Sequence, residues 1–393
     1  MDPYANPFAP GAGSRPPELA GRADLLEEAR VACRRSVEGR HVRGMVMLGL
    51  RGTGKTVLLN EIEGIGRDAG LLTSQVEAPE SASLARLLMP QMTKAMRSLS
   101  GVERAKQIAQ RGLGGLRNFA SIFDLEVAGV AIGVDPEPGL ADSGDMEHDL
   151  PDLFEEIGRA ARAADKGWLL LIDEVQYLTT ADLSALIVAM HRISQKRLPV
   201  LFFGAGLPQV AKLAGNAKSY AERLFTYPAI GPLTTEAARD AIAKPVRGEG
   251  ADISDEALRK MVEGTHGYPF FLQEWGSHAW EAAEGSMISA QDADASHAAS
   301  IRSLDQGFFK VRTDRLTRAE NEFVRAMAHL GDGPYRIADI AAALGKEASA
   351  VSPARANIIG KGMIYSTDHG MLDFTVPLYA EHVRRVNADR DAA

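Results

Sequence analysis

Short continuous apolar runs alternate along the first 230 residues with segments in which apolar residues recur every three or four positions. The second pattern is typical of amphipathic helices, and the first is typical of strands buried on both faces. Strands that alternate with helices predict an α/β fold with a doubly wound parallel sheet, whose ligand lies at the carboxyl ends of the strands. The expected strands are residues 45–48, 71–76, 168–172 and 200–203.

Helical patterns dominate after Leu233, and we expect a small α-helical lid followed by a connecting helix, together covering residues 233–315. Residues 316–393 then show three helical patterns and two apolar runs on either side of the turn Asp368-His369-Gly370. Three helices followed by a hairpin predict a winged-helix domain. In the lid that precedes this domain, Thr235 and Ser254 are expected to cap two helices. A helix-turn-helix would place the third helix in a DNA major groove.

The remaining segments carry weaker signals. Residues 1–17 are rich in Pro, Gly and Ala and are expected to form a flexible N-terminal arm. Residues from about 100 to 149 are interpreted as an insertion in the nucleotide domain (residues 18–232). It is expected to contain a helical or irregular segment, a hairpin at 123–134 centred on Gly129, and an acidic loop.

A glycine-rich motif, Gly-Leu-Arg-Gly-Thr-Gly-Lys-Thr, follows the first strand and precedes a helical pattern. Glycines let the backbone approach phosphates, and the helix N-terminus directs its N–H groups at the anion. Lys55 would reach the β- and γ-phosphates of ATP, and the Thr56 hydroxyl would hold Mg²⁺. An ordinary glycine-rich turn is the alternative, but the strand and helix around the motif favour the P-loop. The predicted nucleotide-binding residues are Gly49, Arg51, Gly52, Thr53, Gly54, Lys55, Thr56 and Val57.

A second motif, Asp173-Glu174, ends the strand at 168–172. Two carboxylates at the end of a central strand are costly unless a cation or a reaction uses them. We expect Asp173 to hold Mg²⁺, directly or through water, and Glu174 to orient and polarise the attacking water. A strand followed by a polar turn is the alternative, which the P-loop makes much weaker.

Composition limits the classes of protein that remain. The 393 residues are 45% hydrophobic and 24% charged, and the net charge of −8 argues against a uniformly basic nucleic-acid coat. Cys33 is the only cysteine, so an intramolecular disulfide is excluded. Residues 1–17 lack the features of a secretory signal, and no apolar run reaches membrane-spanning length. We therefore expect a cytoplasmic protein without a membrane partner.

With both motifs in place, the chain resembles AAA+ and STAND-type P-loop ATPases. The likeness is closest to bacterial and archaeal ATP-binding proteins related to origin-recognition initiators. The resemblance implies that Arg22 lies near the adenine, that Arg223 is an arginine finger acting on a neighbouring subunit's nucleotide, and that Pro269 faces the nucleotide. A working finger would require at least a dimer, whereas an exposed helical arginine without such a role is equally compatible with the sequence.

Two departures from the family pattern accompany this resemblance. Gly204-Ala205-Gly206 stands where many AAA+ proteins place a polar sensor, and the helix opening at Tyr268 lacks the initiators' second-sensor arginine. Loss of these charge-stabilising groups would make hydrolysis slow or dependent on an activator.

The partner of the C-terminal domain stays open at this point. Residues 316–393 contain nine Lys or Arg against ten Asp or Glu, so the electrostatic attraction to DNA is modest. One interpretation is that duplex DNA is contacted by Arg355, Asn357 and Lys361, with Arg384 and Arg385 touching its phosphates. The other interpretation is that the domain binds a protein partner. Three function classes follow: a DNA-dependent ATPase, a STAND-like switch that holds ATP or ADP, and a transcription regulator that senses nucleotide.

Overall fold

The computed structural model describes residues 1–11, 13–80, 83–125 and 135–391. These residues form two compact units. One comprises residues 22–49 and 55–230, and the other comprises residues 1–21, 50–54 and 231–393. The chain therefore passes from one unit to the other and back within the glycine-rich motif.

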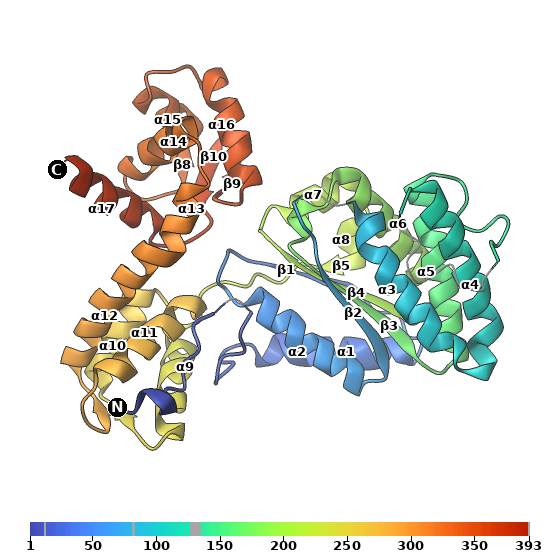
Figure 1. Cartoon of the computed structure of the whole chain (residues 1–393), viewed down its shortest axis with the longest axis horizontal. Helices are drawn as coiled ribbons and strands as arrows, with labels where there is room; N and C mark the ends of the chain where they lie inside the picture. The colour runs from blue at the N-terminus through green and yellow to red at the C-terminus, as the bar shows by residue number, and fades with distance from the viewer. Residues whose placement is uncertain (12, 81–82, 126–134, 392–393) are drawn as a thin grey trace. The chain divides into compact units, whose positions relative to one another are not determined.

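A five-stranded sheet organises the unit that contains residues 55–230 (Figure 1). All neighbouring strands are parallel, in the order β2-β3-β4-β1-β5. The strands β1 and β2 are consecutive in the sequence, but β3 and β4 lie between them in the sheet. This confirms the predicted α/β fold with a parallel P-loop-type sheet. The strands are β1 (Gly44–Leu48), β2 (Leu71–Glu77), β3 (Gly167–Asp173), β4 (Val200–Gly206) and β5 (Phe225–Thr226).

Helices cover both faces of this sheet, with α1 and α2 on one face and α3, α5 and α6 on the other (Figure 1). Every residue of the central strands β3 and β4 is buried, as their continuous apolar sequences predict. The helices are α1 (Ala23–Val37), α2 (Lys55–Asp68), α3 (Leu84–Ser100), α4 (Glu103–Ile122), α5 (Met146–Ala163), α6 (Thr180–Lys196), α7 (Val210–Ala217) and α8 (Ala221–Leu224), with a 3₁₀ turn η2 (Val175–Tyr177).

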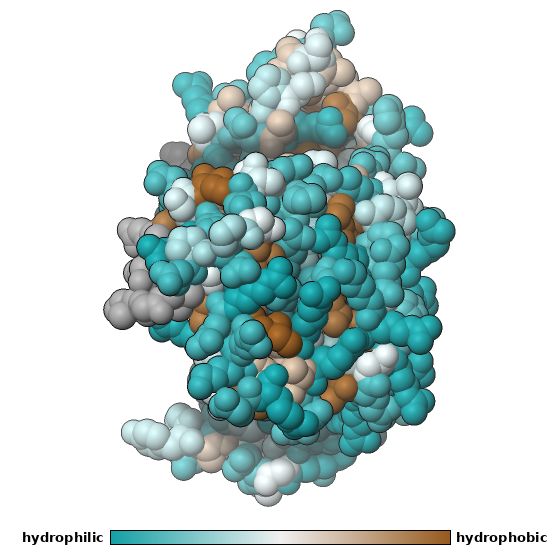
Figure 2. Space-filling view, turned by 90° about the vertical axis from the view of Figure 1, so that its right-hand side faces the viewer, coloured by the Kyte–Doolittle hydropathy of each residue, from teal (hydrophilic) through white to brown (hydrophobic). Residues whose placement is uncertain are grey.

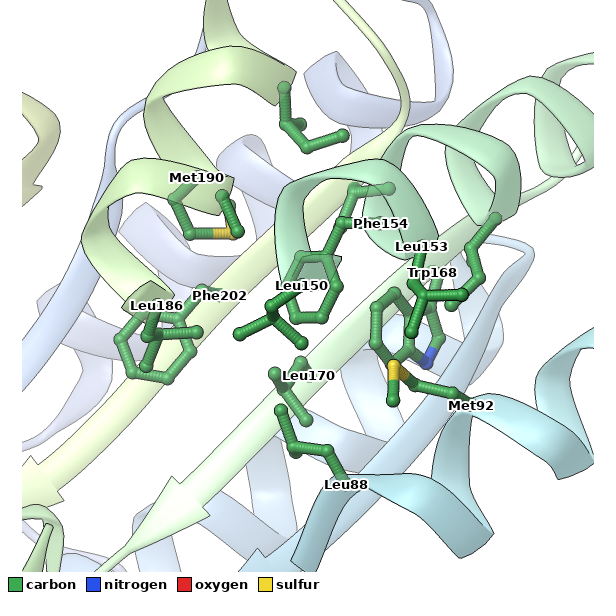
Figure 3. Close-up of a cluster of buried hydrophobic side chains, with 14 of the residues drawn as sticks. Leu88, Met92, Leu150, Leu153, Phe154, Trp168, Leu170, Leu186, Met190 and Phe202 are labelled. Atoms are coloured by element: carbon green, nitrogen blue, oxygen red, sulfur yellow. The ribbon is translucent and has the colours of Figure 1, made fainter. Parts of the chain in front are cut away.

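The main core lies between β3, β4 and the helices α3, α5 and α6 (Figure 3). Phe154 of α5 meets the Trp168 ring edge-on, with ring centroids 5.0 Å apart. The Trp168 indole N–H donates to the Ser74 hydroxyl at 3.0 Å, so the polar atom of this buried ring is satisfied. These contacts fix the position of β3, whose last residue is Asp173.

The segment interpreted as an insertion is mostly helical. Residues 103–122 form one helix, α4, where the sequence left helical and irregular structure open. Phe123 and Leu125 follow this helix outside any strand, which differs from the predicted hairpin, and residues 126–134 of that hairpin lie outside the described residues.

The face shown in Figure 2 is largely hydrophilic, with hydrophobic residues scattered among hydrophilic ones. Among the described residues, no helix is long and apolar enough to span a membrane.

Residues 235–314 of the second unit are mostly helical. The first two helices of this region start at side-chain caps: Ser254 accepts from the Ala257 amide, as predicted, whereas the cap of the preceding helix is Thr234 and not Thr235. The expected connecting helix contains a π-helical turn, η3 (Asp305–Phe309). The other elements are α9 (Thr235–Gly248), β6 (Asp252–Ile253), α10 (Asp255–Thr265), α11 (Pro269–Ala282), β7 (Met287–Ile288), α12 (Ala290–Leu304) and α13 (Lys310–Asp314).

The N-terminal segment packs on α11, which differs from the expected flexible arm. Phe8 is only 5% exposed, and a Cβ added to Gly276 would lie 2.5 Å from its ring. Asn6 donates from its side-chain amide to the Ser277 hydroxyl at 3.0 Å. The Pro- and Gly-rich composition did not reveal that one aromatic residue could anchor the segment in a gap left by a glycine.

Phe8→Ala should destabilise this helical unit by about 3 kcal/mol, because truncating a buried phenylalanine removes apolar contacts and leaves a cavity. Thermal unfolding measures the loss. Tyr4→Ala is the matched control, since Tyr4 is 100% exposed on the same segment. Equal stability of the two variants would show that the segment does not anchor through Phe8.

The last part of the chain has a winged-helix arrangement. Thr317 and Glu320 form a capping box at the start of its first helix. Its three-stranded antiparallel sheet has the order β8-β10-β9, and the short strand β8 gave no signal in the sequence. The elements are α14 (Arg318–His329), β8 (Tyr335–Arg336), α15 (Ile337–Ala343), α16 (Ala348–Gly360), β9 (Ile364–Asp368), β10 (Met371–Phe374) and α17 (Tyr379–Asp391).

Three basic residues suggested as DNA contacts are engaged inside this unit. Lys361 donates to the buried Glu320 carboxylate at 2.6 Å, and Arg384 donates to the Ala328 carbonyl at 2.7 Å. Arg385 makes two bonds to Asp305, at 2.8 and 3.2 Å. Each of these side chains would have to break its internal bond to contact a phosphate, so its part in DNA binding stays a prediction.

Candidate nucleotide site

The start of α2 brings the two predicted magnesium ligands together. Thr56 lies in the first turn of α2, and its hydroxyl donates to Asp173 Oδ2 at 2.5 Å. Asp173 is the last residue of β3, so the parallel sheet delivers its carboxylate to the same edge as the end of β1. Lys55 is 6% exposed, and its charge acts on the Asp173 carboxylate. Lys55, Thr56 and Asp173 therefore form one polar cluster.

Burial raises the pKa of Asp173, while hydrogen bonds from Thr56 and from the Glu174 amide, together with the Lys55 charge, act in the opposite direction. A divalent cation would favour the ionised carboxylate. A threonine hydroxyl and one carboxylate are the hard oxygen ligands that Mg²⁺ takes from proteins when phosphates and water complete its shell. Among the described residues, no group of three His, Cys, Asp or Glu side chains could hold a metal ion. The donor set therefore fits a nucleotide-bound Mg²⁺ better than a metal caged by protein alone.

Glu174 follows in an unusual backbone conformation. Its φ and ψ of 53° and 40° are left-handed, which is uncommon for a residue with a side chain and which concentrates at functional sites. The Glu174 amide donates to Asp173 Oδ1 at 2.8 Å. The chain thus turns sharply as the strand ends, so that two consecutive carboxylates need not share one orientation.

Residues 50–54 of the motif contact the C-terminal part of their own unit. The Phe270 amide donates to the Gly52 carbonyl at 3.2 Å, and the Tyr268 hydroxyl donates to the Arg51 carbonyl. The Arg51 amide donates to the Thr375 carbonyl at 3.2 Å. The glycine-rich loop is thereby bonded both to the start of α11 and to the segment that follows β10. The sequence did not indicate the second contact.

A second arginine lies in the same region. Arg312 of α13 stacks over the Phe308 ring, with its guanidinium carbon 3.9 Å from the ring centroid. Burial, together with the neighbouring Arg51 charge, lowers the pKa of Arg312 to about 10. Phe308 in turn stacks on Phe270, whose amide holds Gly52. The cations Arg51 and Arg312 therefore lie near the loop, although the lid helix itself lacks the second-sensor arginine.

The other predicted site residues are placed as follows. The Gly49 amide donates to the Gly206 carbonyl at 3.0 Å, and Thr53 donates from its hydroxyl to the Leu50 carbonyl at 2.9 Å. Val57 is buried in α2.

Arg22 precedes α1, and burial lowers its pKa. Gly54 lies in the motif with a φ of +91°, Arg223 is exposed on α8, and Pro269 is the first residue of α11.

Comparison with known proteins agrees with this geometry. Residues 18–203 match the family model described as AAA ATPase domain. The matched segment contains both predicted motifs, which confirms the expected resemblance to AAA+-type P-loop ATPases. Residues 306–383 match a second model, described as a domain of unknown function (DUF8462). No curated protein sequence matches the chain.

Solved structures resemble the chain at low sequence identity. The Walker-type ATPase PABY2304 of Pyrococcus abyssi is 16% identical, with 94% of this chain and 97% of that chain covered at a TM-score of 0.52. The RuvB Holliday junction branch migration motor of Thermotoga maritima is 15% identical, with 95% and 99% covered at 0.45. The Orc1 protein of Aeropyrum pernix, in complex with DNA, is 14% identical, with 94% and 94% covered at 0.43. Only the first likeness is strong enough to support the fold.

Proposed function

We propose that this protein binds ATP with Mg²⁺ and hydrolyses it, and that the nucleotide state alters what the C-terminal domain binds. The observation that carries the proposal is the cluster in which Thr56 donates to Asp173 at 2.5 Å beside the buried Lys55. A buried lysine and carboxylate at the edge of a parallel sheet are expensive to desolvate, and a phosphate and a cation would compensate both.

Each residue of the cluster has a role in this proposal. Lys55 and the first amides of α2 bind the β- and γ-phosphates, while Thr56 and Asp173 hold Mg²⁺, which neutralises phosphate charge when bound. Glu174 orients a water and takes its proton as the water oxygen bonds to the γ-phosphorus. The bond from the γ-phosphorus to the bridging oxygen breaks, and ADP leaves with the electron pair.

Coupling to the C-terminal domain follows from the contacts of residues 50–54. The Arg51 amide donates to Thr375, and the Arg51 guanidinium lies directly against Gly362, between α16 and β9. A loop that rearranges when phosphate binds would change these contacts, and so bias a two-state arrangement of the C-terminal domain. Duplex DNA is the proposed partner, because α16 of the winged-helix arrangement carries the partly exposed Arg355 and the exposed Asn357.

A protein partner is the second candidate, and a specific observation favours it. Lys361, Arg384 and Arg385 are engaged internally. The basic residues that remain from β8 to the end of α16 are Arg336, Lys346 and Arg355. About three phosphate contacts predict a salt slope of about −2.7, or a loss of about 40-fold in affinity between 50 and 200 mM salt. That is weak for a DNA-binding domain, and it makes a protein-binding, STAND-like switch a reasonable alternative.

Fluorescence anisotropy with a labelled duplex should separate the two candidates, using the full chain with ATP, with ADP and without nucleotide at both salt concentrations. We expect salt-sensitive affinity that differs between nucleotide states, and a loss of that difference in Arg51→Ala. Arg34→Ala is the matched control, because Arg34 is exposed on α1. No salt-sensitive binding in any nucleotide state would contradict the DNA proposal and favour the protein partner.

Two further proposals rest on the resemblance and not on contacts. Arg223 is exposed on α8, as a finger acting on a second subunit must be, so turnover per subunit should rise with protein concentration. Arg22 and Pro269 would contact the base and the nucleotide. A cytoplasmic location stays a prediction from the sequence.

A further inference from the structure

We propose that Gln176 is a positioning residue that holds the Glu174 carboxylate for water activation by linking it to the end of β4. This inference rests on the proposed hydrolysis and extends it to a residue that is neither a phosphate ligand nor a magnesium ligand in that proposal. All of its contacts lie within the compact unit that contains residues 55–230.

The backbone after β3 returns the Gln176 side chain to Glu174. Glu174 adopts the left-handed conformation, and the 3₁₀ turn η2 follows, closed by a bond from the Tyr177 amide to the Glu174 carbonyl at 3.0 Å. An extended chain would send residues two positions apart to the same face but about 7 Å apart. The tight turn instead brings the two side chains into hydrogen-bond contact.

Both ends of the Gln176 amide are bonded. Nε2 donates to Glu174 Oε2, and Oε1 accepts from the Leu207 amide at 3.1 Å. The partners determine the orientation of the amide, because a carboxylate only accepts and a backbone N–H only donates. Gln176 therefore links a carboxylate at the end of β3 to the backbone at the end of β4.

The glycine at the end of β4 makes room for this link. A Cβ added to Gly206 would lie 2.8 Å from Gln176 Oε1 and 2.8 Å from a methyl group of Val210. The Gly206 carbonyl also accepts from the Gly49 amide, the first residue of the P-loop motif. Gly204-Ala205-Gly206 lacks the polar sensor of many AAA+ proteins, but the space beside it holds the Gln176 amide.

This arrangement predicts a specific kinetic effect. A glutamate side chain has three rotatable bonds, and hydrolysis needs its carboxylate directed at one water. Misplacement of a catalytic group by about 1 Å costs roughly 100-fold in rate. The two bonds of the Gln176 amide go to Glu174 and Leu207, neither of which is proposed to bind phosphate. Loss of Gln176 should therefore lower kcat and leave ATP affinity unchanged.

The test compares Gln176→Ala, Gln176→Glu and Gln195→Ala in the full chain. Gln195→Ala is the matched control, because Gln195 is exposed on α6. Steady-state hydrolysis gives kcat, titration with ATP gives the dissociation constant, and hydrogen exchange reports the Leu207 amide. Gln176→Glu keeps the acceptor for Leu207 but places a carboxylate against Glu174.

We expect Gln176→Ala to lower kcat about 10- to 100-fold, with ATP affinity within twofold of wild type and faster exchange at Leu207. Gln176→Glu should lose turnover while Leu207 stays protected, which a merely structural role would not produce. Wild-type turnover in Gln176→Ala, or a tenfold loss of ATP affinity, would overturn the inference and leave the proposed hydrolysis standing. Absence of turnover in the wild-type protein would overturn both.

Discussion

Lys55→Ala is expected to lower ATP affinity by at least about 100-fold, or about 2.8 kcal/mol. Lys55 is the first residue of α2 and is only 6% exposed, so its ammonium group acts in a site with little water to screen it. Alanine removes the one side-chain cation of the motif that is placed to meet the β- and γ-phosphates, while the helix amides remain. Isothermal titration with ATP and Mg²⁺ measures the change.

Lys94→Ala is the matched control, because Lys94 is exposed on α3 and is not part of the site. Thermal unfolding of both variants separates lost binding from lost folding. Removal of a buried charge next to Asp173 also changes the balance of charge in the cluster, so a modest shift in stability is compatible with the account. Unchanged ATP affinity in a folded Lys55→Ala protein would remove the P-loop interpretation.

Glu174→Gln should retain ATP binding and lose about 10²- to 10⁴-fold in turnover, the range that general-base catalysis contributes. The substitution keeps the shape of the side chain, and its amide oxygen can still accept from Gln176. It removes the ability to accept the proton of the attacking water. Steady-state phosphate release under saturating ATP measures the effect.

Glu28→Gln serves as the control for this substitution, since Glu28 is an exposed carboxylate on α1. Nucleotide titration of Glu174→Gln shows whether binding survives. Turnover equal to wild type in Glu174→Gln would mean that another group positions the water. A loss of binding comparable to that of Lys55→Ala would instead assign Glu174 to nucleotide binding.

The sequence was most informative where a motif and its flanking elements supported one another. The apolar run before Gly49 and the helical period after Lys55 predicted a strand, a loop and a helix, and β1 and α2 are placed accordingly. Burial of β3 on both faces explains why its unbroken apolar run could be read directly. The contact between Thr56 and Asp173, 117 residues apart, follows from the parallel order of the sheet.

Contacts that depend on tertiary structure could not be predicted from the sequence. Phe8 is one aromatic residue in a Pro- and Gly-rich segment, and only the gap at Gly276 explains its burial. The bond from Gln176 to Glu174 was not predicted, because it depends on the left-handed backbone of Glu174. Lys361 looked available on a helix end, but the buried Glu320 carboxylate binds it.

The most direct test of the account is steady-state ATP hydrolysis by the full chain with Mg²⁺, with and without duplex DNA, and with Glu174→Gln as the blank. We expect Mg²⁺-dependent turnover that exceeds this blank, and stimulation by DNA would make the duplex the leading partner. Tight ATP binding without turnover above the blank, in either condition, would contradict hydrolysis at this site and leave a protein that holds its nucleotide.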